Sequence, residues 1–512
     1  MFKNIGSQWI RMVVFIVVGL IVPPLMNRFL GKETYGAWGL VMATTGLMKL
    51  LALGVPIATV RAIAAANTDL EINRVIGTSK RIFFMIGLIA LVVGAGLFAF
   101  FELAYVTEKL VDGVMTSKIS AEDAWAARVA FGLVVAHVAL TFACQLPYAI
   151  LAGKQKFVQQ NKIMIGILLF RVSLIVGVLT LGGSLVLLAV VELITVIFEF
   201  VFPWRAVKRL NPGLRFSMAD FDPDVMKSIF SFGGYMVLMH IGMKLAFQTD
   251  ALVVGWGLNA QSVIDYNQSN TFIIYLIELM IGVGSVIMPM ATKLQKEDKI
   301  RELENIFHKW SKITFSLALL VGSYLLVMGP AFVAWWMRDI TFFEPAKKVV
   351  PALMLSCFVF LPIRAVTLPM LLGLGKVKFP AILFLVIGVL NVGMSMALIG
   401  PLGLYGVALG TAIPNVIYAV IVLVYACRQI DSSVWDYFSY VIPRCTLGAL
   451  PVIAGLLWIR EQFAPRSFIE LFLTGIVMVI GFAIIWVGFV YRGDKYVDLQ
   501  GHLSSFVGRF SK

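Results

Sequence analysis

Long apolar stretches separated by short polar joins run along almost the whole chain. A helix that crosses a bilayer needs about 20 mostly apolar residues. Fourteen segments meet this requirement, at 9–29, 38–60, 82–106, 125–151, 158–181, 185–204, 229–254, 271–290, 313–335, 349–372, 380–399, 405–425, 440–459 and 468–491. The pattern therefore predicts an all-α polytopic membrane protein with about 14 transmembrane helices.

Two sequence echoes predict an internal repeat. The segment G-K-Q-K-F at 153–157 follows the fourth span, and G-K-V-K-F at 375–379 follows the tenth. A weaker echo relates 31–61 to 258–293, because in both an outer-loop Tyr leads into a helix that ends at a basic inner residue. Repeats in matching topological places favour two six-helix lobes of the same orientation.

The predicted domain limits follow from these echoes and from a polar, Pro-containing loop at 205–227. They are 1–210 for an N-terminal six-helix lobe, 211–430 for a C-terminal six-helix lobe, 431–491 for accessory helices 13 and 14, and 492–512 for a cytoplasmic amphipathic tail. A second amphipathic segment, 293–312, places Leu303, Phe307 and Trp310 on one face among charges. It predicts a helix on the inner membrane surface.

Charge placement gives the topology. The net charge is +14, and most Lys and Arg fall in alternate loops that are cytoplasmic if the N-terminus is cytoplasmic. This positive-inside bias predicts that both termini are cytoplasmic. It also accounts for the surplus positive charge, so no nucleic-acid partner is expected. The first span is too long for a signal-peptide core and is interpreted as a retained anchor. Four scattered cysteines have neither metal-site nor disulfide spacing.

Basic residues inside the spans are the main functional signal. They are Arg11, Lys49, Arg171, Lys244 and Arg364. Each costs about 2.5–3.5 kcal/mol at the centre of a spanning helix, so they are expected to line a polar cavity between helices. A cationic cavity suits an anionic cargo, and a diphosphate head group would pair well with Arg and Lys. These residues predict a transporter.

Polar side chains at helical spacing extend this cavity in both lobes. Those expected to line it are Gln8, Thr45, His240, Gln248, Asn267, Thr271, Tyr275, Asn391 and Asn415. The intramembrane carboxylates are Glu192, Glu199, Asp250 and Glu278. Each either pairs with a cation or, for Asp250 and Glu278, couples transport to Na⁺ or H⁺. The alternative for a single Asn, Ser or Thr is a hydrogen bond to a neighbouring helix.

Enzyme signatures are missing from the sequence. It contains no G-x-x-x-x-G-K-[ST] and no H-E-x-x-H, and no loop is long enough for a nucleotide-binding domain. We expect neither a catalytic residue, nor a bound metal, nor a cofactor beyond a coupling ion. ATP-driven transport by this chain alone is not predicted.

Several ordered segments carry a family resemblance. They are L-G-K-E-T-Y-G-A-W-G-L at 30–40, Q-T-D-A-L-V-V-G at 248–255, Asn391, and P-L-G-L-Y-G-V-A at 401–408. Over residues 1–430 the chain resembles the bacterial polysaccharide transporters, the Wzx-type flippases of the multidrug/oligosaccharidyl-lipid/polysaccharide superfamily.

The resemblance implies a MATE-like fold that works by alternating access in a bacterial inner membrane. The implied cargo is an undecaprenyl-diphosphate-linked oligosaccharide, the repeat unit of an O-antigen, capsule or exopolysaccharide. Membrane lipids, a polysaccharide polymerase and glycosyltransferases are the implied partners. Two other functions stay open: a MATE-like multidrug or cation antiporter, and a membrane-embedded glycosyltransferase or ligase. The first would need a net acidic cavity, and the second a clustered acidic or His motif in an outer loop.

Overall fold

The computed structural model describes residues 2–52, 54–111, 114–232, 234–284 and 286–497. The first part contains α1 (Phe2–Leu30), α2 (Lys32–Gly46), η1 (Leu47–Ala52), α3 (Val55–Ala65), α4 (Asp69–Phe101), η2 (Glu102–Val106), β1 (Lys109–Val111), β2 (Val114–Thr116), α5 (Ala121–Gly153), α6 (Phe157–Thr180), α7 (Leu185–Leu210), η3 (Met218–Asp220) and α8 (Pro223–Phe232). The rest contains α9 (Gly234–Gln248), α10 (Asp250–Gly257), α11 (Ala260–Gly284), α12 (Ile287–Lys296), α13 (Ile300–Met337), η4 (Ile340–Phe342), α14 (Phe343–Gly373), α15 (Lys378–Leu402), α16 (Leu404–Gln429), α17 (Val434–Phe463), α18 (Phe468–Ile485) and η5 (Trp486–Val490).

The prediction of an all-α polytopic protein is confirmed, apart from one short β1–β2 hairpin. Among the described residues 13 helices are long and apolar enough to cross a membrane, or 14 if a bent pair counts as one span. That pair is α9 with α10, which bend by 41° at Thr249. The second and eighth predicted spans are also divided, into α2, η1 and α3 and into α11 and α12. The hydropathy pattern predicted the ranges of these three spans, but it does not register the breaks within them.

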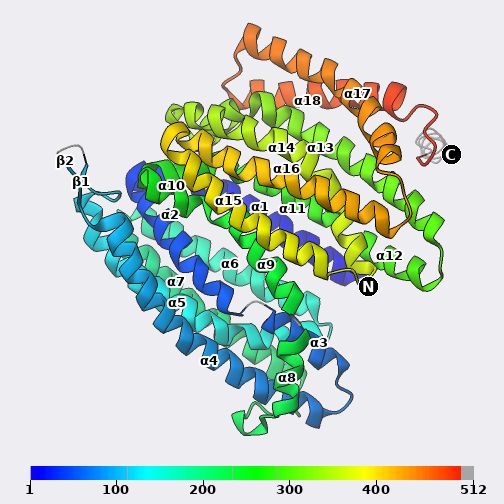
Figure 1. The fold of residues 1–512 in the computed structure, drawn as a ribbon. Coiled ribbons are helices and arrows are strands. Elements are labelled where there is room, and N and C mark those ends of the chain that lie inside the picture. Colours follow the sequence, from blue (N-terminus) through cyan, green and yellow to red (C-terminus); the bar gives the residue numbers. More distant parts are fainter. Residues whose placement is uncertain (1, 53, 112–113, 233, 285, 498–512) are drawn as a thin grey trace, which may run out of the picture. The chain divides into compact units, whose positions relative to one another are not determined.

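The first compact unit contains Met1–Lys244 and Gln248–Ile264. Within it α5 packs along α3, α4 and α7, and α6 contacts both α1 and α7 (Figure 1). The short helix α8 packs on α3 and α4, so the loop after α7 belongs to this unit. The predicted limits at 210, 430 and 491 stay predictions.

The second compact unit contains Leu245–Phe247 and Asp265–Lys512. In it α14 packs against α12, α13 and α16, while α15 and α16 form a helical hairpin. Helix α17 lies along α13 and contacts α18 (Figure 1). Residues 303–310, predicted to lie on the membrane surface, instead form the first turns of α13, with Leu303 and Phe307 buried. The apolar face that suggested membrane contact is therefore a packing face. Of the predicted amphipathic tail, residues 498–512 lie outside the described part.

The repeated G-K-x-K-F segments are equivalent in structure, but not in the register that the letters suggest. Helix α5 ends at Gly153 with Gln155 at φ 57, and α14 ends at Gly373 with Gly375 at φ 70. In both, the next N–H returns to the last turn, from Lys156 to the Leu151 carbonyl and from Lys376 to the Leu371 carbonyl. These are Schellman caps, which need a left-handed residue. Gly153 therefore corresponds to Gly373, two positions before Gly375.

Glycines on α16 allow a close approach to α15. A Cβ at Gly406 would lie 2.1 Å from the carbonyl oxygen of Leu398, and one at Gly410 would lie 2.3 Å from Oγ of Ser395. Small residues four apart are typical of tightly packed membrane helices. This contact explains the glycine at 406 within the 401–408 segment.

The substitution Gly410→Leu is expected to push α15 away from α16. Overpacking costs typically about 1–3 kcal/mol, and here the clash includes the backbone of Ser395. The measurement is thermal unfolding of the purified protein in detergent. Gly393→Leu on α15 is the control, because a Cβ at Gly393 meets no atom within 4 Å. Equal unfolding temperatures of the two variants would contradict the close packing.

Candidate functional site

A cavity of about 420 Å³ lies among α3, α5, α6 and α7 of the first unit. Its polar lining consists of Thr141, Gln145, Tyr148, Gln160, Arg171 and Glu199. The remaining lining comes from Pro56, Val60, Cys144, Ala149, Ala152, Met164, Ile167 and Leu168. Two predicted site residues, Arg171 on α6 and Glu199 on α7, thus meet at one cavity. Six polar side chains inside an apolar bundle are costly unless they are hydrogen-bonded or in contact with water or a ligand. This cavity is therefore the candidate site.

Arg171 forms an ion pair with Glu192, which lies seven residues before Glu199 on the same face of α7. The Glu192 side chain is only 2% exposed, whereas that of Arg171 is 34% exposed and reaches the cavity. Nε of Arg171 is buried and has no hydrogen-bond partner among the described residues. Glu192 therefore holds one Nη of the guanidinium, and a ligand in the cavity can reach the exposed part of the Arg171 side chain.

His137 on α5 completes this cluster. Its Nδ1 lies 2.9 Å from the Glu192 carbonyl oxygen, and because that oxygen can only accept, Nδ1 carries the proton. Its Nε2 lies 3.8 Å from Oε2 of Glu192. His137 was not among the predicted residues, although it shares one face of α5 with Thr141, Gln145 and Tyr148 at helical spacing. That stripe was the signal that would have found it.

Arg11 lies at the edge of the same cavity. Its guanidinium is exposed, and one Nη is 3.8 Å from Sδ of Met164, which lines the cavity. Gln8, one turn earlier on α1, is also exposed. Helix α1 is fixed on α6 by a hydrogen bond of 2.9 Å from Asn161 to Oγ of Ser7. The first helix is thus positioned to present Arg11 to the same face of α6 as Met164, two turns before Arg171.

Lys49 and Lys244 add positive charge to the first unit. Lys49 is exposed on η1, at the break between α2 and α3, and is close enough to Glu199, His137 and Lys244 to interact electrostatically. Lys244 donates to Oε1 of Gln248 at 3.0 Å. His240, one turn before Lys244 on α9, is half-buried.

Thr45 is buried in this structure, and its predicted role in lining a cavity stays a prediction. It is 1% exposed and donates to the Val41 carbonyl of its own helix at 2.7 Å. A hydroxyl satisfied in this way is a packing group. Thr271 is comparable, because it donates to the Asn267 carbonyl at 2.9 Å.

Arg364 is buried inside the second unit, only 4% exposed. Its guanidinium lies 5.7 Å from the ring centre of Phe360 and 5.6 Å from that of Phe384, and it interacts electrostatically with Tyr418 and with the exposed Glu278. Arg364 is therefore enclosed by α14, α15 and α16 in this structure. The predicted role in binding cargo stays a prediction.

The remaining predicted residues of the second half have diverse surroundings. Asn391 joins three helices, donating to Oγ1 of Thr411 at 2.9 Å and to the Ala246 carbonyl at 3.3 Å. Asn415 is 4% exposed, one turn after Thr411. Tyr275 is half-buried on α11. Asp250 is 3% exposed at the start of α10, beside the bend. For Asn391 the hydrogen bond between helices is the better description than cavity lining.

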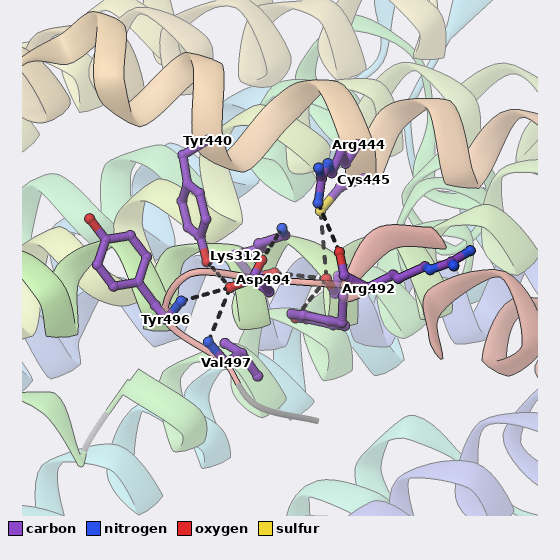
Figure 2. Close-up of polar contacts among 10 residues, drawn as sticks. Lys312, Tyr440, Arg444, Cys445, Arg492, Asp494, Tyr496 and Val497 are labelled. Carbon is purple, nitrogen blue, oxygen red and sulfur yellow. Dashed lines mark hydrogen bonds and ion pairs between the residues drawn. The ribbon is translucent and has the colours of Figure 1, made fainter. Parts of the chain in front are cut away.

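A second buried ion pair joins Lys312 of α13 to Asp494, which follows the last helix (Figure 2). Both side chains are 1% exposed. Asp494 also accepts from the Tyr440 hydroxyl at 2.6 Å and from the N–H groups of Tyr496 and Val497 at 3.0 and 3.1 Å. Burial alone would raise the pKa of Asp494, but the Lys312 ammonium, the Tyr440 hydroxyl and the Tyr496 N–H outweigh it and lower that pKa.

The contacts of Lys312 hold residues 491–497 against α13 and α17. The Lys312 ammonium lies 4.7 Å from the ring centre of Tyr440 and 5.3 Å from that of Tyr491. The sequence did not indicate this ion pair, because Lys312 and Asp494 are 182 residues apart in the chain. We define Lys312, Tyr440, Tyr491 and Asp494 as the C-terminal latch.

The long apolar helices define a polytopic membrane protein, and solved structures share the fold. One is the inward-facing conformation of a multidrug resistance MATE family transporter of the MOP superfamily, at TM-score 0.70 and 19% identity over 84% of this chain and 98% of that chain. Another is the lipid II flippase MurJ in an inward closed conformation, at TM-score 0.70 and 16% identity over 96% of this chain and 99% of that one.

The chain belongs to the polysaccharide biosynthesis protein family, whose model matches residues 3–295. A curated relative is the uncharacterized membrane protein EpsK of Bacillus subtilis (strain 168), which is 25% identical over 285 residues, 54% of this chain. This match spans only about half the length of that relative, 55%. The predicted relationship to polysaccharide biosynthesis proteins is thereby confirmed, and the solved structures confirm the predicted MATE-like fold.

Proposed function

We propose that this protein is a flippase that moves an undecaprenyl-diphosphate-linked oligosaccharide from the cytoplasmic to the periplasmic leaflet of a bacterial inner membrane. The observation that carries the proposal is the cavity of the first unit, where the partly exposed Arg171 lines the wall and Arg11 contacts the lining residue Met164. Membership of the polysaccharide biosynthesis family supports the saccharide part of the cargo.

The diphosphate of the cargo is recognised by guanidinium and ammonium groups. Arg171 is held in one orientation by Glu192, so it loses little side-chain entropy when it binds a phosphate oxygen. Arg11 and Lys49 are exposed and can follow the head group as it moves. The apolar cavity wall from α3, α5 and α6 leaves the polyprenyl tail in contact with lipid while the head crosses. Alternating access moves the head group, and Na⁺ or H⁺ coupling through Asp250 or Glu278 is part of this proposal.

The direct test is the lipid-linked intermediate that accumulates when the gene is deleted. We expect an undecaprenyl-diphosphate-linked oligosaccharide to collect on the cytoplasmic leaflet and surface polysaccharide to disappear, and the wild-type gene to reverse both. Polymerases and glycosyltransferases of the same pathway are the proposed partners. Normal surface polysaccharide in the deletion strain would refute the proposed function.

The substitution Arg11→Gln is expected to lower flux about tenfold, the effect of losing one charge-assisted hydrogen bond to phosphate. Because Arg11 is exposed and in no ion pair found among the described residues, the amount of folded protein should not change. Surface polysaccharide per molecule of transporter is the measurement. Arg28→Gln removes the same charge from the other end of α1 and should behave as wild type.

Multidrug export is the second candidate, and Glu199 is the observation that favours it. This carboxylate lines the cavity without an ion pair in the described structure and would attract a cationic drug. The fold shared with a MATE transporter is compatible with either cargo. Drug susceptibility of the deletion strain separates the two functions, because a flippase for saccharide lipid leaves it unchanged.

A further inference from the structure

A groove of about 750 Å³ runs between α6 and α7 and is separate in chemistry from the cavity at Arg171. One end is basic, with Lys162 near the start of α6 and Arg205 and Arg209 in the last turns of α7. The rest is apolar and includes Phe170, Phe198 and Phe202. The groove thus has a basic end and a long apolar part, which match the anionic head group and the acyl chain of a phospholipid.

The three basic side chains are free to bind an anion. Lys162, Arg205 and Arg209 are all exposed, and none takes part in an ion pair found among the described residues. They lie near the ends of two spans, which places them at head-group depth. Basic pockets between transmembrane helices at this depth are typical of sites for anionic lipid head groups.

The apolar part of the groove is lined by packed aromatic rings on one side and is open at Gly166 on α6. The rings of Phe170 and Phe198 are 4.5 Å apart between centroids, and those of Phe198 and Phe202 are 5.7 Å apart. A Cβ at Gly166 would meet no atom within 4 Å, so the missing side chain leaves room along α6. An acyl chain fits such a channel without displacing any side chain.

We propose that this groove binds an anionic phospholipid of the surrounding bilayer. The phosphate lies between Lys162, Arg205 and Arg209, and an acyl chain lies over Gly166 against the aromatic wall. Because the groove and the cavity share Ile167, the bound lipid packs beside the helix that carries Arg171. The site is independent of the cargo proposed above, which concerns the cavity.

The experiment is native mass spectrometry of the full-length protein, titrated with cardiolipin, phosphatidylglycerol or phosphatidylcholine. Each Lys or Arg near a membrane surface contributes enough to change affinity about fivefold. Arg209→Gln should therefore weaken cardiolipin binding about fivefold, and the triple variant Lys162→Gln, Arg205→Gln, Arg209→Gln about a hundredfold. Lys208→Gln is the matched control, since Lys208 is exposed on the same helix outside the groove.

The apolar part is tested separately by Gly166→Leu, which fills the channel without changing charge. It should reduce binding of cardiolipin and phosphatidylglycerol, whereas Gly177→Leu, at another open position of α6, should not. If the triple variant does not fold, the single variants Arg209→Gln and Gly166→Leu test the proposal by themselves. Binding equal to that of Lys208→Gln, or equal affinity for phosphatidylcholine, would overturn the proposal. So would a polyprenyl diphosphate that displaces the phospholipids at lower concentration, since the groove would then belong to the cargo.

Discussion

Replacing Arg171 by Ala is expected to abolish transport and to lower the amount of folded protein. The substitution leaves the Glu192 carboxylate, 2% exposed, without its cationic partner. Removing one member of a buried pair typically costs about 3–5 kcal/mol. Surface polysaccharide in cells and thermal unfolding in detergent measure the two effects.

The double variant Arg171→Ala, Glu192→Gln separates structure from function. Without the buried charge it should regain most of the thermal stability, but transport should stay at least tenfold below wild type because the phosphate ligand is gone. Restored transport would show that Arg171 only neutralises Glu192, and the cavity would lose its attraction for a diphosphate.

The pair between Arg128 and Glu102 provides the matched comparison. It is a two-bond contact of 2.9 and 2.7 Å with side chains 41% and 30% exposed. An exposed pair contributes about 0–1 kcal/mol. Arg128→Ala should therefore change neither unfolding nor transport appreciably, although the contact geometry is as good as that at Arg171.

Breaking the C-terminal latch is expected to have the second large effect. Lys312→Met leaves Asp494 buried without its ammonium partner, at a cost of about 3–5 kcal/mol. The segment after η5 should then detach from α13 and α17, so trypsin should cut faster after the exposed Arg492 and Lys495. Limited proteolysis and thermal unfolding are the measurements.

The double variant Lys312→Met, Asp494→Asn tests whether the charge pair is the cause. It should restore much of the resistance to trypsin, while Arg444→Gln, which removes only a hydrogen bond to the Arg492 carbonyl, should have a small effect. Because the pKa of folded Asp494 is lowered, the latch is intact at neutral pH and its contribution is lost as pH falls through that pKa. Trypsin resistance of Lys312→Met equal to wild type would refute the latch.

Part of the candidate site was readable in the amino-acid sequence. Arg171 and Glu199 were selected as charges inside apolar segments, and the structure brings both to one cavity. His137 was missed because it was not compared with the polar residues that share its face of α5. The hydrogen bond of Thr45 to its own helix was not readable in the sequence, because a face at helical spacing does not tell whether a hydroxyl bonds its own backbone.

The sequence by itself determined the class of structure, the number of spans and the inventory of intramembrane charge. Apolar length and the cost of burying charge act within one segment, so they are visible in a linear pattern. Only the tertiary structure decided where helices bend, which cation pairs with which carboxylate, and that Asp494 reaches Lys312. Pairing depends on distances between side chains far apart in the chain, and helix packing alone sets those distances.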